Sequence, residues 1–141
     1  MTRISFLSNA QDRLQSAAAW VAQAYREQRQ VLIFAPAPDV AERIDRMLWT
    51  QPATGFIPHC AAAASLSAET PVLIAGTLDD LPQDKCLLNL SNEVPPGFSR
   101  FEEIVEIVSV HDEDRLPARD RFRFYRERGY ALDNRDISEV I

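Results

Sequence analysis

Short runs of apolar residues recur along the chain and predict the strands of a sheet. The clearest run, residues 31–35 (VLIFA), has no polar position, which is typical of a strand that is buried on both faces. Four other segments show a similar short apolar pattern and are also predicted as strands: residues 3–7, 71–75, 86–90 and 103–110.

Two longer segments in the first third of the chain place their apolar residues three or four positions apart, as an amphipathic helix does. The first covers residues 11–28, and the second begins at Asp39, which has Glu42 at the capping-box position. A strand, helix, strand, helix order predicts right-handed crossovers and a parallel sheet. We therefore expect an α/β fold: a single-domain, three-layer α/β/α sandwich with a mostly parallel sheet of about five strands.

Length and composition fit one domain, because 141 residues with 46% hydrophobic and 26% charged positions can bury a substantial core. We assign residues 1–132 to this domain and residues 133–141 to a polar C-terminal tail, ordered only if another element holds it. The N-terminus has no signal-peptide pattern, and no apolar run approaches the ~18 residues of a membrane span. Cys60 and Cys86 have no metal-ligand spacing and read as free thiols, so a cytoplasmic location is expected.

The architecture is Rossmann-like, but the sequence predicts no nucleotide site in it. Only four glycines occur, neither a P-loop nor a G-x-G-x-x-G motif is present, and the loop after residue 35 is proline-rich. His59 and His111 are far apart and have no nucleophile at a familiar spacing. No catalytic residue, metal site or cofactor is therefore predicted, although a small nucleotide-binding α/β enzyme remains an alternative.

The most unusual stretch is residues 114–129 (DRLPARDRFRFYRERG), which is predicted to be a basic helix. Six arginines outnumber Asp120 and Glu127, so residues 115–128 carry a charge of +4, whereas the whole chain carries −6. At about 100° per residue, four of the arginines fall within an arc of roughly 80°. An adjacent arc is apolar. The basic arc contains Arg115, Arg119, Arg123 and Arg126, and the apolar arc contains Ala118, Phe122 and Tyr125.

Guanidinium groups beside an aromatic side chain suit a ligand that carries carboxylates and a hydrophobic group. Two other readings remain open for this helix: an ordinary solvated face, or direct binding of single-stranded DNA. The DNA reading is weaker, because the helix lacks a track of exposed aromatics for base stacking and the pI of the chain is about 4.9.

A second stretch, residues 48–59 (LWTQPATGFIPH), places large apolar side chains in a connection that should run over the surface. Trp49 and Phe56 in such a position are typical anchors for a protein partner. The competing interpretation is that they only cover the edge of the sheet.

Together, residues 48–59 and residues 118–132 (ARDRFRFYRERGYAL) resemble the chi subunit family of the bacterial DNA polymerase III clamp loader. The order of predicted elements and the length also match, so the resemblance covers nearly the whole chain. It implies a non-catalytic adaptor in DNA replication that joins two partners. One is the psi subunit, bound as a 1:1 heterodimer, and the other is the acidic C-terminal tail of single-stranded DNA-binding protein (SSB).

The resemblance also implies which residues bind each partner. The SSB-tail site would comprise Arg115, Arg119, Phe122, Arg123 and Val108, and the psi-facing surface would comprise Trp49, Phe56 and Pro58. The alanine-rich residues after His59 depart from the family pattern, which leaves the border of the psi surface open. A repair helicase as a further partner of this surface, and the presence of psi in the source organism, also stay open.

Overall fold

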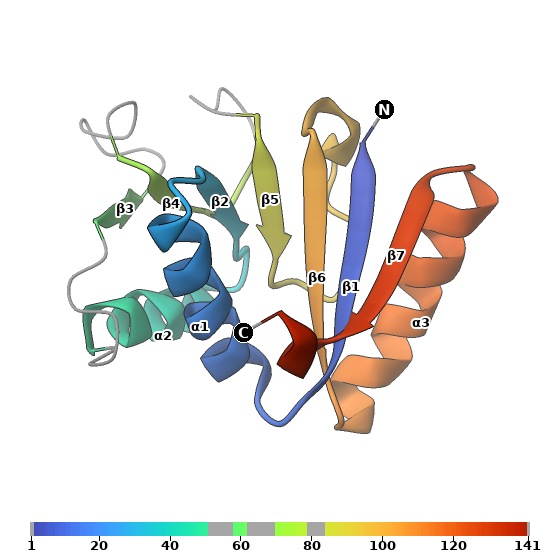
Figure 1. Ribbon diagram of the computed structural model, residues 1–141, viewed down its shortest axis with the longest axis horizontal. Coiled ribbons are helices and arrows are strands. Elements are labelled where there is room, and N and C mark those ends of the chain that lie inside the picture. Colours follow the sequence, from blue (N-terminus) through green and yellow to red (C-terminus); the bar gives the residue numbers. More distant parts are fainter. Residues whose placement is uncertain (1, 51–57, 62–69, 79–83, 141) are drawn as a thin grey trace.

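A computed structural model describes residues 2–50, 58–61, 70–78 and 84–140 of the chain. Its centre is a seven-stranded sheet with the strand order β3-β4-β2-β5-β6-β1-β7 (Figure 1). All the described strand pairs are parallel. The strands are β1 (Arg3–Ala10), β2 (Val31–Phe34), β3 (His59–Ala61), β4 (Val72–Ala75), β5 (Cys86–Asn89), β6 (Glu103–Ser109) and β7 (Ala131–Asp136).

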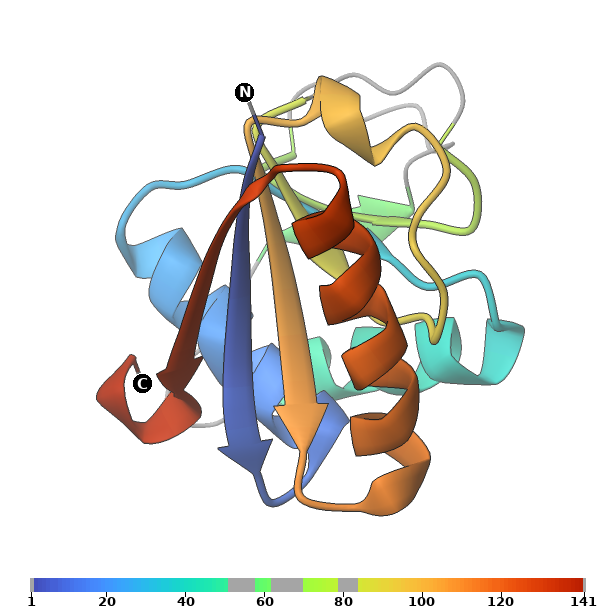
Figure 2. The same cartoon turned by 90° about the vertical axis from the view of Figure 1, so that its right-hand side faces the viewer.

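Helices cover both faces of the sheet and give the predicted three-layer sandwich. Helices α1 (Arg13–Arg26) and α2 (Pro38–Thr50) pack on one face, and α3 (Asp112–Glu127) packs on the other, to the right of β6 in Figure 2. Two short 3-10 turns, η2 (Phe98–Arg100) and η3 (Ile137–Glu139), complete the described elements. No helix in these described segments is long and apolar enough to cross a membrane.

The apolar runs of the sequence become strands that are buried on both faces. Along β2, Val31 and Ile33 join the hydrophobic core under α1 and α2, whereas Leu32 and Phe34 join the core under α3. This alternation follows from the two-residue repeat of a strand. Tyr125 of α3 is fully buried in the second core.

Local sequence also explains where the helices begin. The Asp12 carboxylate accepts a hydrogen bond from the Gln15 amide at 2.9 Å and caps α1. In α3, three acidic residues occupy the first turn, where they favour the positive end of the helix dipole. A proline is tolerated best in the first turn of a helix, but α3 begins at Asp112 and Pro117 lies one turn further in. This position costs α3 one internal hydrogen bond.

The sheet has two strands more than the sequence predicts. Strand β3 is only three residues long and lies in the segment predicted to be irregular. Strand β7 (ALDNRD) is polar because it is an edge strand, paired along β1 and mostly exposed. Residues 133–136, assigned to a polar tail, therefore belong to the sheet, and Ile137 after them is buried in the α1–α2 core. Strand β1 is the element that holds this tail in place.

Candidate functional site

A groove of about 370 Å³ runs along α3 on the side that faces β7. It contains all five residues that the resemblance assigns to the SSB-tail site, and we name it the basic groove. Its lining residues come from four elements: Phe6 and Ser8 of β1, Val108 of β6 and Asn134 of β7 face Arg115, Ala118, Arg119, Phe122, Arg123 and Arg126 of α3. The structure therefore brings together the arc of four arginines and the aromatic side chain that the helix periodicity predicts.

The four arginines of the basic groove differ in their ion pairing. Arg115 contacts the Asp112 carboxylate at 2.5 Å and Arg123 contacts Asp120 at 3.7 Å, both within the helix. These exposed pairs contribute little energy, about 0.2–1 kcal/mol each. Within the described part of the chain, Arg119 and Arg126 have no carboxylate within 4 Å. They are therefore the two guanidinium groups whose charge an incoming ligand would meet unneutralised.

The two remaining arginines of the predicted basic helix do not face the groove. Arg128 lies over the ring of Phe124, with its guanidinium carbon 4.2 Å from the ring centre. Arg121 is buried at 2% exposure, and its Nε donates a hydrogen bond to Glu106 at 3.1 Å. The positive charge that faces the groove thus comes from four side chains, the same four that helix periodicity places in one arc.

The apolar part of the basic groove is a packed aromatic wall. Phe122 is partly buried and meets Phe6 edge to face, with ring centres 5.2 Å apart. Val108, at 6% exposure, lies beneath it at the end of β6. Because the wall is held by the core, an apolar side chain could enter the groove without reordering it.

The opposite wall of the groove is polar and was not predicted. Ser8 donates its hydroxyl hydrogen to the Asn134 side-chain oxygen at 3.3 Å. This contact leaves the Asn134 amide NH₂ available as a donor to a ligand. Alternation along β1 could have indicated Phe6 and Ser8, but nothing in the sequence marks Asn134, because its strand is too polar to be predicted.

The second predicted surface lies at the far edge of the sheet, beside α2 and β3 (Figure 1). Trp49 is the last residue but one of α2 and has 56% of its surface exposed, and its ring meets that of His59 in β3 edge to face, with ring centres 5.1 Å apart. The His59 Nε2 atom lies 2.9 Å from the Asp45 carboxylate of α2, so this contact between β3 and α2 holds the imidazole ring that the indole meets. Pro58 precedes β3 and is half-buried, and Phe56 lies outside the described residues.

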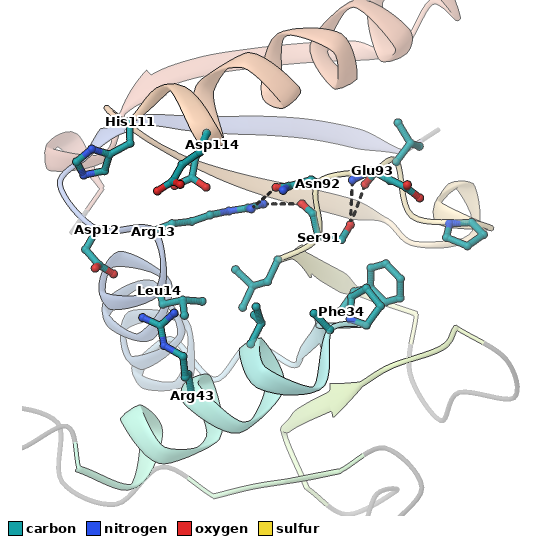
Figure 3. A pocket seen from close by; sticks show the side chains of 17 residues that line it. Asp12, Arg13, Leu14, Phe34, Arg43, Ser91, Asn92, Glu93, His111 and Asp114 are labelled. Atoms are coloured by element: carbon teal, nitrogen blue, oxygen red, sulfur yellow. Dashed lines mark hydrogen bonds between the residues drawn. The ribbon is translucent and has the colours of Figure 1, made fainter.

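The carboxyl edge of a parallel sheet is where such folds usually bind ligands, and a cavity of about 780 Å³ opens there (Figure 3). The Arg13 guanidinium crosses it, but it already donates to Ile107, Asn89 and Ser91 carbonyls and to Asn92. Burial lowers the pKa of Arg13. The remaining charged lining residues are four carboxylates and one arginine: Asp12, Glu93, Glu113, Asp114 and Arg43.

This charge distribution would repel a nucleotide phosphate, since the partly buried Arg13 already donates four hydrogen bonds that join the loop after β5 to β6. The described residues also contain no group of three or more histidine, cysteine, aspartate or glutamate side chains that could hold a metal ion. His111 precedes α3, and its ring contacts the Gln11 carbonyl at 3.2 Å. The basic groove is therefore the better candidate site.

Beneath α3, Glu106 of β6 is completely buried and accepts three hydrogen bonds. The donors are Arg121 Nε at 3.1 Å, the Tyr125 hydroxyl at 3.0 Å and the Asn89 amide at 2.9 Å. Burial, and then the Glu106 charge, raise the pKa of Tyr125, so its hydroxyl stays a donor. This buried cluster fixes α3 on the sheet and so determines which side of the helix faces the basic groove.

Fold and site together define a Rossmann-like α/β protein with a basic groove beside its last helix and no phosphate-binding loop in the sequence. Comparison with known proteins identifies the family. The family described as "DNA polymerase III chi subunit, HolC" matches residues 1–133, and the chain belongs to this family. It is thus a chi subunit with a role in DNA replication.

Three curated relatives carry the name "DNA polymerase III subunit chi". The protein of Pseudomonas aeruginosa is 32% identical over 146 aligned positions, which cover 99% of this chain and 100% of the relative. The Escherichia coli protein is 30% identical, with 79% of this chain and 77% of the relative covered. The Haemophilus influenzae protein is 27% identical, with coverages of 80% and 79%.

Proposed function

We propose that this chain is a non-catalytic adaptor of the polymerase III clamp-loader assembly. In this role the basic groove binds the acidic C-terminal tail of SSB, and the surface around Trp49 binds the psi subunit. The observation that carries the proposal is the composition of the basic groove, where four arginines lie beside an aromatic wall. A peptide with carboxylates and a terminal apolar residue is complementary to that combination.

Within the groove, we assign the terminal carboxylate of the tail to Arg119, because this guanidinium has no carboxylate within 4 Å among the described residues and sits one turn from Phe122. Arg115 and Arg123 then contact the preceding acidic residues, exchanging their weak partners Asp112 and Asp120 for the ligand. The last apolar side chain of the tail packs on Phe122 and Val108.

The positions of the two surfaces support a bridging role. The surface around Trp49 adjoins β3 at one edge of the sheet, and the basic groove adjoins β7 at the other. Six strand spacings of about 4.8 Å place the two edges about 29 Å apart. Two partners could therefore bind at the same time without meeting.

A titration by fluorescence anisotropy tests the groove. The probe is a labelled peptide that copies the last ten or so residues of the SSB of the same organism. We expect micromolar affinity, about −8 kcal/mol, that weakens as salt rises. Arg119→Ala should weaken binding about tenfold, equivalent to ~1.4 kcal/mol, and deleting the last peptide residue should do the same or more.

Arg128→Ala is the matched control, because it removes the same charge from the same helix at a position stacked on Phe124 outside the groove. Equal losses in the two variants would mean that only the general charge of the helix matters, and the groove assignment would be wrong. A salt-independent affinity would also contradict it. Binding of a bare oligonucleotide at physiological salt, with none of the peptide, would instead favour direct DNA binding.

A further inference from the structure

Helix α3 has a second groove on its other side, which the proposed function does not use. This cavity of about 400 Å³ lies between α3 and the loop after β5. Its walls include Val94, Leu116 and Phe124, and we name it the apolar groove. Leu116 is 49% exposed and lines the cavity together with the partly buried Val94 and Phe124. The apolar groove thus offers a hydrophobic contact surface.

Arg121 supplies unused hydrogen-bond donors to the same groove. Its side chain lines the cavity and is 2% exposed, yet Nη1 and Nη2 have no hydrogen-bond partner among the described residues. A guanidinium group has five N–H donors and cannot lose its charge in a protein. Only Nε is bonded, to a Glu106 carboxylate that also serves Tyr125 and Asn89. A buried donor nitrogen without an acceptor is unfavourable, so an acceptor from outside the domain would be stabilising.

Charge decides which acceptor fits. The buried Arg121 charge is already neutralised by Glu106, which is 0% exposed. Glu93 and Asp120 line the mouth of the groove and are exposed. A carboxylate or phosphate would therefore enter past two acidic groups towards a cation that is already paired. A neutral carbonyl oxygen does not meet this repulsion.

We propose that the apolar groove is a docking site for a peptide segment of a partner protein. The segment places a main-chain carbonyl on Nη1 and Nη2 of Arg121 and an apolar side chain against Leu116 and Phe124. Basic residues that flank the apolar one face Glu93 and Asp120. This ligand has the opposite charge to the one proposed for the basic groove, so the two sides of α3 select different partners.

The first experiment separates the acceptor types with two small probes that share one isobutyl group. In ¹H–¹⁵N spectra of the labelled full-length protein, we would titrate N-methylisovaleramide and isovalerate, which differ in carrying a neutral amide or a carboxylate. The amide should shift the Arg121 Nε–H signal and the backbone signals of residues 93, 94 and 116–121, saturating at millimolar concentration. Isovalerate should bind at least fivefold more weakly. Equal or tighter binding of isovalerate would overturn the proposal.

The second experiment tests the flanking charges. An acetylated, amidated tetrapeptide of arginine, leucine, glycine and arginine should shift the same signals, at least fivefold more tightly than the peptide with glutamate in both arginine positions. A preference for the acidic peptide would exclude the proposed partner chemistry.

Variants separate this groove from the basic one. Replacing Arg121 would leave Glu106 buried and unpaired, so the decisive variant is Leu116→Ser, which removes the exposed apolar wall and leaves the buried cluster intact. It should weaken binding of the amide at least fivefold, whereas Arg119→Ala in the basic groove should leave that binding unchanged. Unchanged binding in Leu116→Ser would refute the site. So would a crystal structure with the amide present in which its carbonyl oxygen lies beyond hydrogen-bond distance of both Arg121 nitrogens.

Discussion

Glu106 is the residue whose replacement should reveal most about how α3 is held on the sheet. Its carboxylate has no exposed surface and accepts hydrogen bonds from Arg121, Tyr125 and Asn89. In Glu106→Ala, three buried donors lose their acceptor and the Arg121 charge is left uncompensated in the interior. We expect the free energy of unfolding to fall by about 3–5 kcal/mol, the usual cost of breaking one side of a buried ion pair.

For a chain of this length, each kcal/mol corresponds to about 3 °C in Tm, so the transition should move down by about 10–15 °C. Urea denaturation followed by circular dichroism would give the free energy, and a thermal scan the shift in Tm. The matched comparison is the double variant Glu106→Leu with Arg121→Met, which replaces the charged pair by apolar side chains of similar size.

The double variant should lose only about 1–3 kcal/mol, because no buried charge remains, the Tyr125 hydroxyl loses its acceptor, and the Asn89 amide keeps its hydrogen bond to the Glu93 carbonyl. It should therefore be more stable than Glu106→Ala despite carrying one more substitution. A loss below about 1 kcal/mol in Glu106→Ala would mean that water reaches Arg121 freely, and our account of a dry buried pair would be wrong.

Three further predictions concern other parts of the fold. Burial, and to a lesser degree the Glu103 charge, raise the pKa of the Cys86 thiol. Ellman's reagent at neutral pH should therefore label Cys60 first and leave Cys86 unreacted in the native protein. In urea, Cys86 should react as well. Hydrogen bonds donated by Ser138, and next by Asn9, lower the pKa of the Asp136 carboxyl. The stabilisation that this carboxylate contributes should therefore be present at neutral pH and be lost as pH falls below about 4. An NMR titration of Asp136 with a midpoint at or above about 4 would contradict the lowered pKa. Gly129 follows α3 at a φ of 82°, so Gly129→Ala should lower the free energy of unfolding in urea by roughly 1–2 kcal/mol. An unchanged free energy of unfolding would show that the backbone at the end of the helix can change its conformation at no cost.

The sequence predicted the parts of the fold that are buried, because burial leaves a periodic pattern. The run at residues 31–35 indicated a strand enclosed on both faces, and β2 has that environment. The edge strands carry no such pattern. Strand β7 buries little and pairs with β1 through main-chain groups, which any polar residue supplies, so ALDNRD could not be recognised as a strand.

The site was predictable to the extent that one helix builds it. Helical spacing placed Arg115, Arg119 and Arg123 on one face, and the structure lines one groove with them. The same spacing could not show that Arg121 turns inward, because its partner Glu106 sits in a different element fifteen residues earlier. Nor could it identify Asn134, whose place depends on the pairing of β7 with β1. Contacts between distant segments are set by the tertiary fold and not by local pattern.

The pairing of β1 with β7 has a consequence for synthesis of the protein. Residues 3–8 lie beside residues 131–136. The floor of the basic groove, at Phe6, is therefore made early in the chain, whereas its polar wall needs Asn134. At about 5–20 residues per second, a ribosome completes that wall many seconds after it has made the floor. A nascent chain therefore exposes Phe6 with neither α3 nor β7 to cover it. It cannot present the assembled groove to a partner before β7 has been translated, so recognition through this groove is restricted to molecules that already contain residues 131–136.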